Sequence, residues 1–175
     1  MVKALFPGTF DPIHRGHTDI AERAARLFDE VIMAVYDKPL KSLLFTPEER
    51  IALVTEALNE NPKITVTGYS GLTVEFARQV GAQVIVRGLR VFSDFEFEFR
   101  MGLANQRLAS DIETVAFITA EEHTFLSATT VKEIAMLNGD VSSMVPPHVE
   151  EALKNKVGGL DGLDGQNSPP NALRD

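Results

Sequence analysis

Short apolar runs alternate along the chain with longer stretches in which apolar positions recur at helical spacing. Short runs rich in Val and Ile are typical of strands that are buried on both faces of a sheet. Such runs occupy residues 2–6, 30–36, 63–69, 83–88 and 113–118. The longer stretches predict helices from about residue 16 to 28 and over residues 46–58, 73–80, about 94–108, 129–137 and 146–157.

Two of the predicted helices carry recognisable signals at their ends. Thr46 is expected to be an N-cap, with Pro47 as the first helical residue and Glu49 as the partner that completes a capping box. Gly81 follows residues 73–80 and predicts a helix end, because glycine readily adopts the left-handed conformation that closes many helices. These boundaries follow from local sequence alone.

The order of the elements predicts the fold class. Strands that alternate with helices favour parallel pairing, because parallel neighbours need crossover connections. We therefore expect an α/β fold: a Rossmann-like, doubly wound, mostly parallel five-stranded sheet with helices on both faces. Residues 1–157 would form this domain, and residues 158–175, rich in Gly, Asp and Pro, are expected to be a disordered tail.

Composition narrows the classes of function. The chain of 175 residues has no cysteine, which excludes disulfides, thiolate nucleophiles and zinc–cysteine sites. A net charge of −8 argues against broad nucleic-acid binding, which needs a basic surface. No apolar run reaches the ~18–20 residues of a membrane span, and the start is broken by Pro7 too early for a signal peptide. We expect a cytoplasmic protein that binds neither nucleic acid nor membranes.

The loop after the first strand, "PGTFDPIHRGH", is the first candidate site. In open α/β sheets this loop commonly holds phosphate, and Gly8, the Thr9 hydroxyl and a helix N-terminus near Gly16 suit an anion. His17 would lie in the first helical turn, where it can stabilise charge that develops during phosphoryl transfer. Alternatively, His14 and His17 cap the helix or pack in the core. A metal pair is disfavoured, since no third ligand lies nearby.

The segment "VIVRGLRVFSDFEFE" is the second candidate. Arg87 and Arg90 flank the end of a predicted strand, and guanidinium groups bind phosphate in bidentate geometry. The alternative is a solvated cluster of ion pairs with Asp94, Glu96 and Glu98. The location at a strand's carboxyl end favours the phosphate site.

Hydroxyl groups at another predicted helix start form the third candidate. Ser127, Thr129 and Thr130 suit a triphosphate beside a helix N-terminus, although plain N-capping would explain one of them. Lys41 follows the second strand and could neutralise a phosphate, or it could simply be solvated.

Four motifs taken together resemble a known family. They are "PGTFDPIHRGH", "KSLLFTPEER", "VRGLRVFSDFEFE" and "SATTVKE". The first resembles the T/H-x-G-H signature of the nucleotidyltransferase superfamily. All four in this order, from about Lys3 to Lys156, closely resemble the bacterial phosphopantetheine adenylyltransferase family, and the "RGLR" block is the specific part.

The resemblance implies an activity. Members transfer AMP from ATP to 4′-phosphopantetheine, giving dephospho-coenzyme A and pyrophosphate in the penultimate step of coenzyme A biosynthesis. It implies in-line attack with charge stabilisation by His17 and basic residues. It further implies Mg²⁺ carried with ATP rather than held by protein ligands, feedback binding of coenzyme A, and a homohexamer. Two alternatives stay open: a related enzyme with another acceptor, such as nicotinamide mononucleotide, and a catalytically silent nucleotide-binding module.

The resemblance also assigns residues by position. Catalytic roles fall on His17, Lys41 and Arg90, and the phosphopantetheine site on Thr9, Lys41, Thr73 and Arg87. The ATP site falls on Thr9, Phe10, His17, Gly88, Leu89, Arg90, Glu98, His123, Thr124, Phe125, Leu126, Ser127, Ala128 and Thr129. The chain departs from the family at Ala128, where a serine is usual, and at His123, where Trp is common.

Overall fold

Five parallel strands form a single sheet in the order β3-β2-β1-β4-β5. The computed structural model describes residues 1–37 and 43–161, with side chains described to residue 158. The strands are β1 (Lys3–Gly8), β2 (Glu30–Tyr36), β3 (Ile64–Tyr69), β4 (Val84–Leu89) and β5 (Glu113–Ile118). β1 lies between β2, the next strand along the chain, and β4. The strand order therefore reverses at β1, and folds of this class open a crevice at such a reversal.

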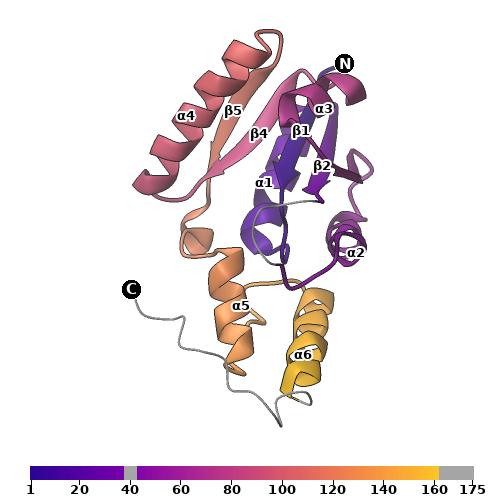
Figure 1. Ribbon diagram of the computed structural model, residues 1–175, viewed down its shortest axis with the longest axis vertical. Helices are drawn as coiled ribbons and strands as arrows, with labels where there is room; N and C mark the ends of the chain where they lie inside the picture. The colour runs from indigo at the N-terminus through magenta and orange to yellow at the C-terminus, as the bar shows by residue number, and fades with distance from the viewer. Residues whose placement is uncertain (38–42, 162–175) are drawn as a thin grey trace.

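Helices cover both faces of the sheet, as predicted (Figure 1). Ala4 and Phe6 of β1 point to one face and join the core that includes α1 (Arg15–Leu27), α2 (Pro47–Leu58), α5 (Ala128–Met136) and α6 (Pro147–Asp161). Leu5 points to the other face and packs with α3 (Thr73–Val80). The alternation follows from the pleat, which turns successive side chains to opposite faces. Figure 1 shows α5 and α6 side by side beyond one end of the sheet.

Local signals placed several boundaries correctly. Thr46 accepts a hydrogen bond from the Glu49 amide, and the Glu49 carboxylate accepts one from the Thr46 amide, so the predicted capping box of α2 is confirmed. Gly81 ends α3 with φ of 72°, a left-handed conformation that explains glycine at this position. The ranges predicted for β2 and β5 are those observed.

Other boundaries differ from the prediction. β1 continues through Pro7 and Gly8 in register with β2, and α4 (Phe92–Leu108) begins two residues earlier than expected. α6 continues to Asp161, so residues 158–161, assigned to a disordered tail, are helical. Gly158 and Gly159 suggested a break in the helix, although Leu160 follows Val157 at helical spacing. The rest of the predicted tail, 162–175, lies outside the described residues.

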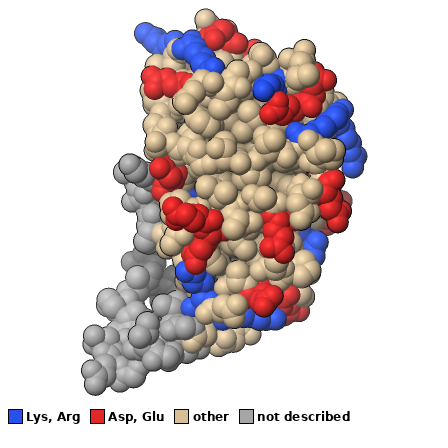
Figure 2. Space-filling model, turned by 90° about the vertical axis from the view of Figure 1, so that its right-hand side faces the viewer, with Lys and Arg blue, Asp and Glu red and all other residues tan. Residues whose placement is uncertain are grey.

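The surface shows how the charge is distributed. Figure 2 shows one face, on which acidic side chains are interspersed with basic ones around a largely uncharged upper area. Over the described part of the chain, no helix is both long and apolar enough to cross a membrane. The expectation that the chain does not bind nucleic acid stays a prediction.

Candidate active site

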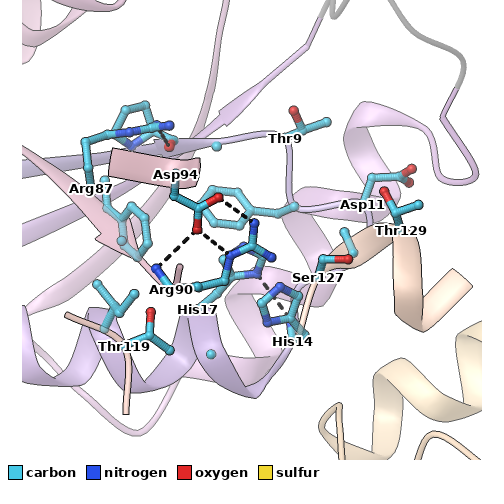
Figure 3. Close-up of a pocket in the computed structure, with 18 of the residues that line it drawn as sticks. Thr9, Asp11, His14, His17, Arg87, Arg90, Asp94, Thr119, Ser127 and Thr129 are labelled. Carbon is cyan, nitrogen blue, oxygen red and sulfur yellow. Dashed lines mark hydrogen bonds and ion pairs between the residues drawn. The ribbon is translucent and has the colours of Figure 1, made fainter. Parts of the chain in front are cut away.

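A cavity of about 370 Å³ opens at the carboxyl ends of β1 and β4, where the strand order reverses. Its walls come from the loop after β1, the first turns of α1, the end of β4, α4, and the start of α5 (Figure 3). All three sequence candidates thus contribute to one cavity. Parallel strands explain this convergence, because their carboxyl ends and the loops that follow them share one edge of the sheet.

The loop after β1 is held by a buried arginine. Arg50 of α2 is fully buried, and its Nη1 donates to the carbonyl oxygens of Thr9 and Tyr36 at 2.7 Å each. Phe10 adopts a left-handed conformation with φ of 49°, which is strained for a residue other than glycine. The Phe10 ring meets the His17 ring edge to face, with centroids 5.0 Å apart. The loop is therefore shaped to bring Phe10 against His17.

The two histidines stand at the start of α1 and stack on each other. His14 is the N-cap and His17 lies in the first turn, as predicted for His17. Their ring centroids are 3.6 Å apart with an interplanar angle of 21°. The backbone N–H of His14 donates to Nδ1 of His17 at 3.3 Å. Capping and cavity lining, which the sequence presented as alternatives, therefore occur together.

Both histidines are held in the neutral form. Loss of solvent, followed by repulsion from His14, Arg90 and Arg87, holds the pKa of His17 well below its ordinary value. Burial, with repulsion from Arg90 and His123, lowers the pKa of His14 to about 3. Since a neutral imidazole carries one proton and Nδ1 of His17 accepts a hydrogen bond, Nε2 of His17 carries the proton. His17 therefore has a hydrogen-bond donor but no positive charge.

The arginines both line the cavity and form ion pairs. Arg87 donates to both carboxylate oxygens of Glu98 at 2.7 and 2.6 Å, and to the Pro7 carbonyl oxygen. Arg90 pairs with Asp94 and donates to the Leu126 carbonyl oxygen at 2.7 Å. The sequence offered a phosphate site or a cluster of ion pairs for these arginines. The two are compatible, since carboxylates of α4 orient guanidinium groups that face the cavity.

The start of α5 completes the wall. The Ser127 hydroxyl caps the helix by accepting from the Thr130 amide at 3.0 Å, so N-capping is confirmed for this residue. Ser127, Ala128 and Thr129 line the cavity, whereas Thr130 bonds to the Ser127 hydroxyl instead. The helix N-terminus presents free backbone N–H groups, which attract anions.

An ion pair that the sequence interpretation missed lies at the same end. Lys132 lines the cavity and donates to Asp11 at 2.7 Å, and Asp11 is 2% exposed. Asp11 also accepts from the backbone amides of Leu44 and Phe45. Lys132 follows Thr129 by three residues and so shares its helix face, a spacing that could have identified it. The loop after β1 is thereby joined to α5 and to the start of α2.

Other predicted residues do not line the described cavity, and their roles stay predictions. Thr73 bonds to the Tyr69 hydroxyl at 3.0 Å, and Leu89 lines a groove beside α4 instead. The segment 123–126 lies next to the cavity: the Leu126 carbonyl binds Arg90, and the β-carbon of His123 would be 3.6 Å from a β-carbon at Gly16. Lys41 lies outside the described residues.

Comparisons with known proteins agree on one family. A family model described as cytidylyltransferase-like matches residues 5–134. A phosphopantetheine adenylyltransferase from Roseiflexus sp. is 54% identical over 158 residues, covering 90% of this chain and 99% of that protein. The enzyme of the same name from Desulfitobacterium hafniense is 50% identical, covering 87% and 94%.

A solved structure shares the fold. It is a protein from Vibrio parahaemolyticus named provisionally as a nicotinate-nucleotide adenylyltransferase, with a TM-score of 0.67 and 20% identity, and the match covers 89% of this chain and 100% of that one. At that identity the likeness concerns the fold alone. The fold is thus shared beyond close relatives.

Proposed function

The chain belongs to the phosphopantetheine adenylyltransferase family, and we propose that it transfers AMP from ATP to 4′-phosphopantetheine in the cavity at the ends of β1 and β4. Dephospho-coenzyme A and pyrophosphate are the products. An oxygen of the acceptor phosphate attacks the α-phosphorus of ATP, and the bond from that phosphorus to the bridging oxygen breaks as pyrophosphate leaves. The acceptor is already largely ionised at neutral pH, so the reaction needs no strong base.

The fixed orientation of the His17 ring, with Nδ1 occupied by the His14 amide, is the observation that carries this mechanism. The ring is fixed by three contacts: the His14 amide on Nδ1, the His14 ring against its face, and the Phe10 ring. A fixed neutral donor can hydrogen-bond an oxygen of the α-phosphate as its charge grows in the transition state, without the cost of reorienting. We therefore give His17 the role of stabilising the transition state, not that of a nucleophile.

The basic groups hold the two anionic substrates together despite their mutual repulsion. Arg90, Lys132 and the N-terminus of α5 lie around the histidines and suit the triphosphate. Arg87, which reaches the Pro7 carbonyl oxygen, suits the phosphate of the acceptor together with Thr9. Lys41 and Thr73 keep the acceptor roles that the resemblance implies.

The carboxylates in the cavity do not form a cage for a metal ion. Asp11, Asp94 and Glu98 each pair with a basic side chain. Within residues 1–37 and 43–161, no three His, Asp or Glu side chains gather as metal ligands. These residues fit Mg²⁺ that arrives bound to the triphosphate, where it would offset the charge of the leaving pyrophosphate.

Substrate choice is tested directly by pyrophosphate release. We expect release from ATP with 4′-phosphopantetheine, and none when nicotinamide mononucleotide replaces the acceptor or CTP replaces ATP. Release with nicotinamide mononucleotide would identify an enzyme with another acceptor. ATP binding without release for either acceptor would identify a silent binding module.

We also propose a homohexamer and feedback binding of coenzyme A. In support of assembly, α4 has no buried residue and exposes several large apolar side chains, among them Phe95, Phe97 and Phe99. Light scattering should give six times 19.2 kDa, and a monomer at micromolar concentration would contradict assembly. Coenzyme A shares the dephospho-coenzyme A moiety of the product, so it should compete with phosphopantetheine. A cytoplasmic location stays a prediction.

A further inference from the structure

A threonine on the cavity wall holds a buried hydroxyl that is not used. Thr119 follows β5 directly, and its backbone N–H donates to the Leu89 carbonyl oxygen at 2.8 Å. The residue is 7% exposed, yet its Oγ1 has no hydrogen-bond partner among the described residues. Thr119 lines the cavity, and Figure 3 shows its hydroxyl turned toward the interior. A buried hydroxyl without a partner costs folding free energy, so a ligand that satisfies it recovers that cost.

The surroundings of this hydroxyl are apolar. Ile20 of α1 and Gly88 of β4 line the same part of the cavity. A β-carbon at Gly88 would lie 2.5 Å from Cδ1 of Ile20 and 4.0 Å from Oγ1 of Thr119, so a larger residue at position 88 would force Ile20 to shift. Glycine here keeps open a recess with apolar walls and one hydroxyl.

The recess differs from the part of the cavity that suits phosphate. In Figure 3, Thr119 lies on one side of His17, whereas Ser127 and Thr129 at the start of α5 lie on the other. Phosphate groups favour the N-terminus of α5 and the positive charge of Lys132 on that helix. A neutral, planar group with hydrogen-bonding edges favours apolar walls with one hydroxyl that can both donate and accept.

We propose that the Thr119 hydroxyl hydrogen-bonds the purine base of the nucleoside triphosphate and helps to determine which base the cavity accepts. This inference rests on the proposed function, because it assumes that the triphosphate lies between His17 and α5. Thr119 would then anchor the base while His17 contacts the α-phosphate. A site that hydrogen-bonds a polar edge discriminates against groups that cannot pair with it.

The test replaces the hydroxyl by a methyl group of similar size. Thr119→Val should weaken ATP binding in titration calorimetry by roughly fivefold to tenfold, the effect of one hydrogen bond to a neutral group. Inorganic tripolyphosphate, which has no base, should bind to Thr119→Val and wild-type protein alike. The midpoint of urea unfolding should stay the same or rise, because the substitution removes an unsatisfied polar group. Thr55→Val, which alters an exposed threonine of α2, is the matched control.

Three results would overturn the inference: ATP binding within about twofold of wild type, equal weakening of tripolyphosphate and ATP, or a lowered unfolding midpoint. The first would mean that Thr119 does not contact the base, the second would assign it to phosphate, and the third to the fold. Should the valine variant not fold, Thr119→Ser and Thr119→Ala decide, since only the serine keeps the hydroxyl and should retain ATP affinity. Binding is measured without acceptor, so a protein that binds ATP but releases no pyrophosphate would contradict the proposed function and leave this test intact.

Discussion

Of the helices that supply side chains to the cavity, α1 and α4 are held in opposite ways. α1 buries five residues against the sheet, including Ile20, Ala21 and Ala24, and carries His17 in its first turn. α4 buries none, and reaches the cavity through Asp94 and Glu98, which pair with Arg90 and Arg87. Its apolar side chains face outward, with Phe92 at 89% exposed. Close packing in the core positions α1, whereas α4 rests on β4 and β5 without burying a side chain and is tied to the cavity by ion pairs.

This difference suits the role of each helix: α1 carries the transition-state donor, and α4 supports the arginines that bind phosphate. A transition-state donor must be preorganised, which a helix packed into the core ensures. Guanidinium groups that bind phosphate can keep their carboxylate partners, because each group has five N–H donors and the ion pair fixes its orientation. The outward apolar face of α4 is where a second copy would complete its packing in the proposed assembly.

Removal of the His17 ring on α1 should have the largest effect on activity. We expect His17→Ala to lower kcat by roughly a hundredfold to ten-thousandfold, because the donor stabilises only the transition state. ATP affinity should change much less in titration calorimetry. His148→Ala, which alters a histidine outside the cavity, serves as the control. Equal losses in kcat and affinity would assign His17 to uniform substrate binding.

Truncation of apolar side chains tests the packing contrast itself. Ile20 is 4% exposed, so Ile20→Ala should lower the free energy of unfolding by about 2–4 kcal/mol in urea titrations. Phe97 is 59% exposed, and Phe97→Ala should change it by less than about 0.5 kcal/mol for an isolated chain. Any larger cost for Phe97→Ala should grow with protein concentration, since only assembly buries this ring. A large cost independent of concentration would show that the Phe97 ring is buried within its own chain.

A change of pH should have a smaller effect, which acts on stability through the histidines at the start of α1. The folded-state pKa of His14, about 3, lies below its ordinary value of 6.5, so the unfolded chain binds the proton more readily. The contribution of His14 to stability is thus complete above pH 6.5 and is lost as the pH falls toward 3. His17 acts in the same direction.

Between about pH 7.5 and pH 5.5, His14 should account for a loss of about 1 kcal/mol in the free energy of unfolding. Urea titrations at both pH values measure it, and His14→Asn, which keeps an N-capping residue, should show a loss smaller by that amount. An identical pH dependence in the variant and the wild type would mean that His14 is protonated at similar pH in the folded and unfolded chain.

Local sequence predicted the elements well because their signals are local. The Thr46–Glu49 capping box, Gly81 and the apolar runs of β2 and β5 each act within a few residues, and each appears as expected. The end of α6 was missed because Gly158 and Gly159 suggested a break, although Leu160 keeps the apolar spacing. The motifs also led to the correct edge of the sheet, since residues that follow parallel strands meet there.

Sequence patterns predicted the order of strands and helices, the parallel sheet, the edge at which the cavity forms and the family. What each side chain does at that edge depends on tertiary packing. Lys132 meets Asp11 across 121 positions, Arg87 meets Glu98 while reaching Pro7, and Thr119 keeps a buried hydroxyl that has no partner within residues 1–37 and 43–161. Such pairings depend on how separate elements pack, and no local hydrogen bond or period encodes them. The protonated nitrogen of His17 is likewise a product of packing, since burial and the His14 amide select it.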